Sequence, residues 1–380
     1  MRVASLALVA SALLLAGCAS SASSAPRDRA APAPTTTASP TSTTAPPTTV
    51  PTTTSAAPAP KVFPPGTFDH TDALLEQRVQ SAGLASGMIR IVAADGQVIH
   101  EHAVGGMSGA TPLSVASSSK WLTAATLMTF VDRHAIGLDD DISKWLPEFA
   151  GSNPPITVHE LLDHTSGVHD NPCQGDGTPL ATCVRTLAVS PRQFAAGSAF
   201  SYGNSPFLVV GRLVEVLGGA DFATVVRQQL TGPLGMDHTT WPGAPSAPNP
   251  AFGASITVDD YGKFLDMLLH QGVSNGTRVL SADAVHQIVS NQVAGYDTSQ
   301  DYSVGITKIP RYGLGCWIDV QEPSGATAVV SGNGGEGFYP WVDYTTQTWG
   351  IVGVQDERGA QVAVPASQVV EVEARTAVAR

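Results

Sequence analysis

Ser117 and Lys120 lie three residues apart in the segment Val-Ala-Ser-Ser-Ser-Lys-Trp-Leu, residues 115–122. In a helix this spacing places both side chains on one face, so the lysine amine can reach the serine hydroxyl. Burial would lower the pKa of Lys120 toward neutrality and leave a free amine able to accept the hydroxyl proton. The positive end of the helix dipole would favour the same ionisation. The pair predicts a nucleophilic serine, although an N-cap serine followed by a solvent-reaching lysine has the same spacing.

Tyr202 and Asn204 are a second pair of polar side chains that this chemistry would use. They follow the loop of residues 195–201 and come directly before a predicted helix. A phenol at this place can relay a proton between Ser117 and a leaving group, and a carboxamide can orient the lysine and a substrate carbonyl. The alternative interpretation makes Tyr202 an aromatic residue at the rim of a cleft and Asn204 a turn residue.

The elements that must position these side chains predict an α+β fold. Residues 121–131 are apolar on nearly every side of a helix, which indicates a helix buried at the centre of the domain. Strands near both ends of the chain, with helices between them, predict one antiparallel sheet flanked by helices, with an inserted all-α lobe and a cleft between lobes.

The sequence signals for these elements are local ones. The dipeptide Asp95-Gly96 between two strand-like segments is a strong signal for a β-hairpin. Helices are predicted to begin at the capping box of Thr157, where Gly167 can close the helix, at Ser205 and at Thr257. The predicted strands are residues 88–93, 97–104, 312–320, 326–330, 338–343 and 348–354.

Taken together, these motifs resemble the serine β-lactamase and penicillin-binding protein superfamily, and within it the class C β-lactamase-like and esterase branch. The resemblance covers most of the chain after residue 61, and the motifs occur in the family's order. It implies the fold predicted above and an acyl-enzyme on Ser117. Besides the two pairs already named, it rests on residues 137–147, 156–167, 233–236 and 312–315.

The third motif departs from the family's pattern. Relatives have Lys or His, a small residue and Gly on the strand that lines the cleft, whereas the best match here begins at Asn333. By resemblance, that cation helps to hold the carboxylate of β-lactams and peptidoglycan termini, so its replacement predicts weaker recognition of anionic substrates. An oxyanion hole needs only backbone N–H groups, which we expect from Ser117 and from the segment Gly335-Glu336-Gly337.

His159, His164 and His169 could indicate a Ser-His-Asp triad. By resemblance, however, residues 164–167 are structural in this family, and a satisfied polar turn is the interpretation that we adopt for them. We therefore assign no catalytic role to the three histidines.

The N-terminus predicts export and a lipid anchor. The apolar run of residues 3–16 is too short to span a bilayer as a stable helix and is typical of a secretion signal. It ends in Leu-Ala-Gly-Cys, which resembles the lipobox where bacterial signal peptidase cleaves before a lipid-modified cysteine. We expect residues 1–17 to be the signal peptide and Cys18 to be the anchored first mature residue. An ordinary cleaved signal with an incidental cysteine is the alternative.

Two further segments follow from this interpretation. Residues 18–61 are rich in Pro and Thr and cannot bury enough apolar surface to fold, so they predict a disordered tether. Residues 62–380 are long enough for a hydrolase domain of two lobes. The protein would then stand on the outer face of the cell membrane, held by its lipid.

Charge and cysteine usage narrow the choice of partners. The net charge is −12, and no cluster of Lys and Arg occurs, which argues against nucleic acid and against an anionic membrane surface as partner. The cysteines and histidines lack the paired spacing of zinc sites, and the predicted chemistry needs no metal or organic cofactor. In an oxidising compartment Cys173 and Cys183, which flank a Gly/Pro loop, are predicted to form a disulfide, and Cys316 to be a buried small hydrophobe.

These observations predict a serine hydrolase that cleaves a small-molecule ester or amide through an acyl-enzyme on Ser117. One alternative is a β-lactamase-related, penicillin-recognising D,D-peptidase acting on cell-wall peptides. Another is a catalytically idle cell-surface binding lipoprotein, which Asn333 motivates and which the intact Ser117, Lys120 and Tyr202 oppose. The sequence leaves open whether Lys120 or Tyr202 is the immediate base.

Overall fold

One antiparallel sheet of six strands joins the two ends of the domain. The computed structural model describes residues 61–380 apart from 171–172, 174–176, 300, 302–310 and 355–362. The strand order is β2-β1-β10-β9-β8-β7, so the first strand pairs with the last, with Gly87 opposite Val354. The strands are β1 (Gly87–Ala93), β2 (Val98–Val104), β7 (Trp317–Gln321), β8 (Thr327–Ser331), β9 (Phe338–Asp343) and β10 (Thr348–Val354). The predicted sheet is confirmed.

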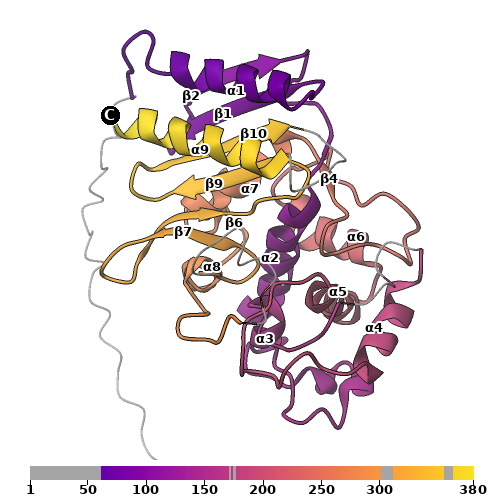
Figure 1. Cartoon of the computed structure of the whole chain (residues 1–380). Helices are drawn as coiled ribbons and strands as arrows, with labels where there is room; N and C mark the ends of the chain where they lie inside the picture. The colour runs from indigo at the N-terminus through magenta and orange to yellow at the C-terminus, as the bar shows by residue number, and fades with distance from the viewer. Residues whose placement is uncertain (1–60, 171–172, 174–176, 300, 302–310, 355–362) are drawn as a thin grey trace, which may run out of the picture. The chain divides into compact units, whose positions relative to one another are not determined.

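Two helices from opposite ends of the chain cover one face of this sheet. Figure 1 shows α1 (Asp69–Ser81) and α9 (Ala363–Ala379) lying side by side over the strands. Their contact with the sheet is apolar, because alternate residues of β1, β9 and β10 point to this side. The buried cluster there includes Leu75, Ile89, Trp341, Val352 and Val370.

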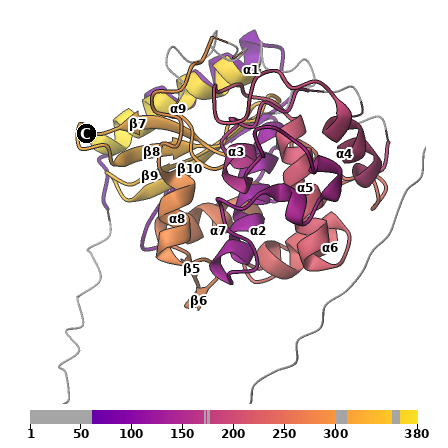
Figure 2. The same cartoon turned by 90° about the horizontal axis from the view of Figure 1, so that it is seen from below.

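The other face of the sheet carries the larger core and the helical lobe. Helix α7 (Val258–Leu269) packs on β9 and β10, and α2 (Ser119–Asp132) connects the sheet to the lobe. Figure 2 shows the lobe helices gathered on one side of α2, away from the strands. This arrangement confirms the predicted inserted all-α lobe. Its helices are α3 (Val158–Leu162), α4 (Leu180–Val189), α5 (Ser205–Gly218) and α6 (Phe222–Val226), with α8 (Ala282–Val289) following α7.

Helix α2 is the central element, as its sequence predicts. All residues from Ser119 to Phe130 are buried, so the helix has no solvent-facing side. The ring of Trp121 meets Phe264 of α7 edge to face, with 5.5 Å between the ring centroids. A helix enclosed in this way is a rigid support for whatever its first turn carries.

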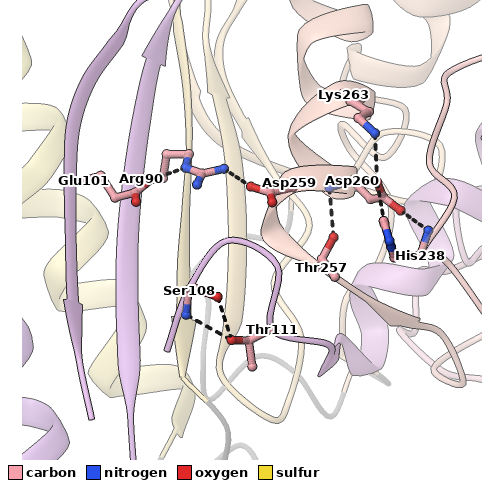
Figure 3. A network of polar contacts seen from close by, with 9 residues as sticks. All are labelled: Arg90, Glu101, Ser108, Thr111, His238, Thr257, Asp259, Asp260 and Lys263. Carbon is pink, nitrogen blue, oxygen red and sulfur yellow. Dashed lines mark hydrogen bonds and ion pairs between the residues drawn. The ribbon is translucent and has the colours of Figure 1, made fainter. Parts of the chain in front are cut away.

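A polar network fixes the start of α7, and the strand before α7 pairs with the segment that leads into α2. The short strand β3 (Leu113–Ser114) pairs with β4 (Ser255–Ile256), which runs directly into α7. In Figure 3, Arg90 of β1 lies between Glu101 of β2 and Asp259, the second residue of α7, and forms an ion pair with each. The fully buried Asp260 accepts hydrogen bonds from the His238 amide at 2.6 Å and from Lys263 Nζ at 3.0 Å. The start of α7 is therefore anchored both to the sheet and to the lobe.

Helix starts follow the predicted capping residues. The Thr157 hydroxyl accepts from the Glu160 amide while the Glu160 carboxylate accepts from the Thr157 amide, which completes the capping box of α3. Thr257 caps α7 in the same way through the amide of Asp260. However, α3 ends at Leu162 rather than near Gly167, because Asp163 leaves the helical conformation.

The strand predicted at residues 312–320 is shorter than expected. Strand β7 begins only at Trp317, and the preceding residues form a turn in which the Gly313 amide donates to the Cys316 carbonyl at 2.8 Å. Gly315 adopts a φ of +83°, and a Cβ at this position would lie 2.8 Å from the Lys120 carbonyl oxygen. The backbone turns here because it packs directly on α2.

The lobe contains the predicted disulfide. Cys173 is bonded to Cys183 of α4, with their Cα atoms 5.7 Å apart. Cys316 is fully buried, and its thiol donates to the Ile288 carbonyl at 3.3 Å.

The predicted signal peptide, Cys18 and nearly all of the tether of residues 18–61 lie outside the described residues. Among the helices that the structure does describe, none combines the length and the apolar composition that a membrane crossing requires.

Candidate active site

Ser117 and Lys120 meet at the entrance to α2. Ser117 belongs to a short 3₁₀ turn, Ala116–Ser118, that precedes α2, so both side chains are held by the same buried element. Lys120 Nζ donates to Ser117 Oγ at 3.1 Å. Ala116, directly before the serine, has a φ of +42°, an uncommon conformation for a residue with a Cβ. A strained turn of this kind occurs often where a side chain must be presented to a site.

The lysine amine is held by three acceptors. Besides Ser117 Oγ, it donates to Asn204 Oδ1 at 2.7 Å and to the carbonyl oxygen of Ala251 at 3.1 Å. Its side chain has no solvent exposure. The predicted proximity of Ser117, Lys120 and Asn204 is therefore present, whereas the contact with Ala251 was not predicted, because a backbone carbonyl leaves no signature in a sequence.

Burial changes the protonation of Lys120. Removal from water lowers the pKa of its amine from 10.5 to about 7, and the negative charge of Asp170 opposes part of that shift. Near neutral pH a large fraction of the side chain is thus a free amine, able to accept a proton from the hydroxyl 3.1 Å away.

Tyr202 completes the cluster from the opposite side. Its hydroxyl is hydrogen-bonded to Ser117, and its ring lies with the centroid 4.8 Å from Lys120 Nζ. Burial raises the pKa of Tyr202 above its ordinary value of 10, the hydrogen bond with Ser117 lowers it, and the charges of Asp170 and Asp301 raise it. The phenol is therefore protonated at neutral pH.

His164 supports the tyrosine ring. The imidazole is buried, and its centroid is 4.7 Å from that of Tyr202 and 4.9 Å from that of Tyr312. Burial lowers the pKa of His164 well below 6.5, and the neighbouring charge of Lys120 lowers it further. Its contacts are ring contacts and a 3.3 Å approach of Nε2 to the Tyr312 hydroxyl.

The other two histidines lie in different surroundings. His159 Nε2 is 3.1 Å from Gln292 Oε1, and His169 Nδ1 is 2.8 Å from the carbonyl oxygen of its neighbour Asp170. Each of these imidazoles therefore bonds a polar group that is not part of the Ser117, Lys120 and Tyr202 cluster.

The glycine-rich segment between β8 and β9 lies against the serine turn. A Cβ on Gly334 would be 2.2 Å from the carbonyl oxygen of Val115 and 3.1 Å from Ser118 Oγ, so only glycine fits there. Ser118 Oγ also bonds the Gly332 carbonyl. Gly335 and Glu336 form the tip of a turn that the Gly337 amide closes by donating to the Gly334 carbonyl at 2.9 Å.

Asn333 has its side chain hydrogen-bonded to Tyr339, a residue of the sheet face that α1 and α9 cover. The Asn333 carboxamide therefore has a partner in the sheet. Among the residues that the structure describes, no group of His, Cys, Asp and Glu is arranged to hold a metal ion.

Comparisons with known proteins show which family has this fold. A family model described as Beta-lactamase matches residues 71–372. The chain belongs to the Beta-lactamase family. Family membership makes the antiparallel sheet and the helical lobe a shared architecture rather than a feature of this chain alone.

Three relatives illustrate the range of the Beta-lactamase family. Esterase EstB of Burkholderia gladioli is 32% identical over 194 residues, which cover 43% of this chain and 49% of the esterase. Penicillin-binding protein 4 of Amycolatopsis lactamdurans is 30% identical over 280 residues, 60% of this chain and 71% of that protein. A crystal structure from Bacteroides dorei DSM 17855 superposes with a TM-score of 0.74 at 27% identity, covering 82% of this chain and 99% of that one.

The match to the esterase thus spans about half of that protein's length. Relatives in this family carry different activities under similar folds, so the choice between them has to come from the site.

Proposed function

We propose that the protein is a serine hydrolase that cleaves a carboxylic ester or amide through an acyl-enzyme on Ser117. The observation that carries this proposal is the 3.1 Å hydrogen bond between Ser117 Oγ and the amine of a lysine with no solvent exposure. A buried amine with a pKa of about 7 is a suitable base for a serine hydroxyl at neutral pH.

In the first half of the reaction, Ser117 Oγ attacks the substrate carbonyl and its proton passes to the Lys120 amine. The carbonyl oxygen of the tetrahedral intermediate takes the negative charge, which backbone N–H groups of Ser117 and of the turn at residues 334–337 would stabilise. The intermediate then collapses, the bond to the leaving group breaks, and the leaving group receives a proton. The acyl group is now an ester of Ser117.

In the second half, water attacks the acyl-enzyme and gives its proton to the same amine. The second tetrahedral intermediate releases the acid, and Ser117 Oγ regains a proton. No other reactant is consumed, so one water molecule is used for each ester or amide cleaved.

The division of labour between the two candidate bases follows from their surroundings. Lys120 has a lowered pKa and is available as a free amine, while Tyr202 has a raised pKa and is a proton donor. We therefore infer that Lys120 is the base toward Ser117. Tyr202 would hand its proton to the leaving group and then take from Lys120 the proton that Ser117 gave up, so the amine beside it is free again before water attacks the acyl-enzyme.

The substrate that we propose is a neutral ester or amide. The carboxamide of Asn333 stands where the family's pattern has a cation, and it already bonds Tyr339. The net charge of the chain is −12, which disfavours the approach of anions. A D,D-peptidase is the second candidate, and the similarity to penicillin-binding protein 4 supports it.

Three substrates separate these candidates: a short-chain nitrophenyl ester, a chromogenic cephalosporin and a D-Ala-D-Ala peptide. We expect the ester to be turned over fastest, with kcat at least ~10³-fold lower in Ser117→Ala. A serine-directed fluorophosphonate should label the wild type and Ser324→Ala, in which an exposed serine of the β7–β8 turn is replaced, but not Ser117→Ala. Absence of both turnover and labelling would leave a binding protein without catalysis as the better interpretation.

The site of action that we propose is the outer face of the cell membrane. Support comes from the sequence alone: the apolar run of residues 3–16 and the lipobox-like Leu-Ala-Gly-Cys that ends at Cys18. The test is cell fractionation of the full chain and of Cys18→Ala. The wild type should sediment with membranes and incorporate a labelled fatty acid, whereas the variant should do neither. Equal fractionation of the two would overturn the anchor.

A further inference from the structure

Asn204 comes directly before helix α5, at the N-cap position, and asparagine there ordinarily caps the helix with its own side chain. Here it does not, and no side-chain hydrogen bond from Asn204 reaches the helix amides. Its Oδ1 instead accepts from Lys120 Nζ at 2.7 Å. The Asn204 side chain is thus committed to the lysine, and the backbone amides of Asn204 and Ser205, which lie before the first intrahelical hydrogen bond, need an acceptor from another part of the chain.

Asp170 supplies that acceptor from the chain segment between α3 and α4. Its Oδ1 accepts from the amides of Asn204 and Ser205, each at 2.8 Å. The carboxylate also lies against the backbone of Gly203, where a Cβ would be 2.9 Å from Oδ1. A negative charge at a helix N-terminus is favourable because it faces the positive end of the helix dipole.

We propose that Asp170 is a positioning residue for the acyl transfer: by holding the backbone amides of Asn204 and Ser205, it fixes the place from which the Asn204 carboxamide holds Lys120. This inference rests on the hydrolase function proposed above. Asp170 is not among the hydrogen-bond partners of Ser117 or Lys120, and it acts through Asn204, whose carboxamide holds the lysine.

The charge of Asp170 has a second effect. It raises the pKa of Lys120 against the larger lowering by burial, and it raises the pKa of Tyr202. Among the residues that the structure describes, Tyr202 and the neutral His164 also lie near the amine, and the charge of Asp301 acts on Tyr202. Removing the charge while keeping the hydrogen-bond acceptor therefore changes the protonation of the amine without removing the cap.

Two substitutions separate the cap from the charge. Asp170→Asn keeps an oxygen acceptor for the amides of α5 but has no charge. We expect its kcat to stay within a few-fold of the wild type, and the acid limb of its kcat/KM against pH to move to lower pH. Asp170→Ala removes the acceptor, so the backbone at Asn204 loses its anchor and the carboxamide its fixed place beside Lys120, and kcat should fall ~10- to 10²-fold with little change in KM.

The matched control is Asp221→Ala. Asp221 caps α6 of the same lobe by accepting from the Thr224 amide at 3.0 Å, and it is not one of the proposed site residues. Loss of this cap should lower Tm and leave kcat unchanged. The test of action through Asn204 is the double variant: Asp170→Ala with Asn204→Ala should be no slower than Asn204→Ala alone.

All rates are measured with the full chain on a neutral nitrophenyl ester and divided by the concentration of fluorophosphonate-reactive sites. If Asp170→Ala matches the wild type in kcat, or if the two losses in the double variant simply multiply, the positioning role is overturned while the hydrolase function stands. If Asp170→Ala does not fold, an unmoved acid limb in Asp170→Asn overturns the role of the charge. A wild type that neither cleaves the ester nor reacts with the fluorophosphonate overturns the hydrolase function and, with it, this role.

Discussion

At the scale of single residues, the feature that sets this site apart is a lysine whose amine is enclosed by protein acceptors. Lys120 Nζ has Ser117 Oγ, Asn204 Oδ1 and the Ala251 carbonyl as partners and no exposure to solvent. None of these partners is negatively charged, so nothing in direct contact compensates for the loss of hydration of an ammonium ion. That imbalance is what brings the pKa near neutrality.

The protonation of Lys120 predicts the pH dependence of the reaction. Because burial lowers its pKa to about 7, the amine is protonated and inactive as a base below that value and free above it. We expect kcat/KM for a neutral ester to rise with pH, with a midpoint at about 7. Initial-rate assays at a series of pH values measure the midpoint. Lys120→Met should be inactive at every pH tested. A midpoint near the ordinary lysine value would contradict the assignment of the base.

Tyr202 offers a test of the proton donor. Tyr202→Phe keeps the ring that packs on His164 and Trp317 but loses the hydroxyl that bonds Ser117. We expect kcat to fall ~10²- to 10⁴-fold, the usual loss when one general acid is removed, with Tm changed little. The variant should still react with a fluorophosphonate, although more slowly. An unchanged kcat would mean that the leaving group takes its proton elsewhere.

At the scale of elements, the parts of the structure that the sequence predicts are those with a local cause. Asp95-Gly96 forms the β1–β2 hairpin and Thr157 caps α3, because each signal acts within a few residues of itself. The turn at Gly315 was missed because its cause is the backbone of α2. The cap from Asp170 was missed for the same reason, since its amide donors lie 34 and 35 residues later.

The proposed catalytic pair could be chosen from the sequence because its spacing follows the period of a helix. Lys120 lies three residues after Ser117 in a segment that does become helical. The glycine-rich segment at residues 334–337 could be placed only by resemblance. This part of the chain meets the serine turn across more than two hundred positions. The hydrogen bond from Ser118 Oγ to the carbonyl of Gly332, just before the segment, spans 214.

Gly334 tests how closely these two elements must approach. In Gly334→Ala the new Cβ would lie 2.2 Å from the Val115 carbonyl oxygen, so the serine turn or the strand must move. We expect a loss of about 1–3 kcal/mol in the free energy of unfolding and a strongly reduced kcat. Gly219→Ala, at the end of α5 with φ +67° and open space around it, should cost about 1 kcal/mol and leave kcat unchanged. Equal behaviour of the two variants would show that the contact is unimportant.

At the scale of the whole domain, helices cover both faces of the sheet, and the helical lobe lies on one of these two sides. The site lies where these parts meet: Ser117 and Lys120 come from the central helix, Tyr202 and Asn204 from the lobe, and Gly334 from the sheet. Any motion of the lobe against the sheet therefore changes distances within the site.

The disulfide tests the stability of the lobe. Cys173 and Cys183 are ten residues apart in sequence, and a cross-link of that length contributes about 3 kcal/mol by restricting the unfolded chain. Replacing both cysteines by serine should lower the free energy of unfolding in urea by about that amount. Because a cross-link acts mainly on the unfolded chain, kcat per active site should stay within a few-fold of the wild type. A much larger loss of activity would show that the lobe also depends on this bond for its shape near the site.

The pairing of β1 with β10 bears on how the polypeptide reaches this structure. Strand β1 is synthesised well before β10, yet β10 is the strand that pairs with it from Gly87 to Ala93. Until that partner is synthesised, the N-terminal hairpin has an unpaired inner edge that can associate with other chains. Folding must close a loop that contains all the described elements between these two strands before the sheet is complete, which predicts a slow rate-limiting step and an opportunity for chaperones to hold the nascent chain.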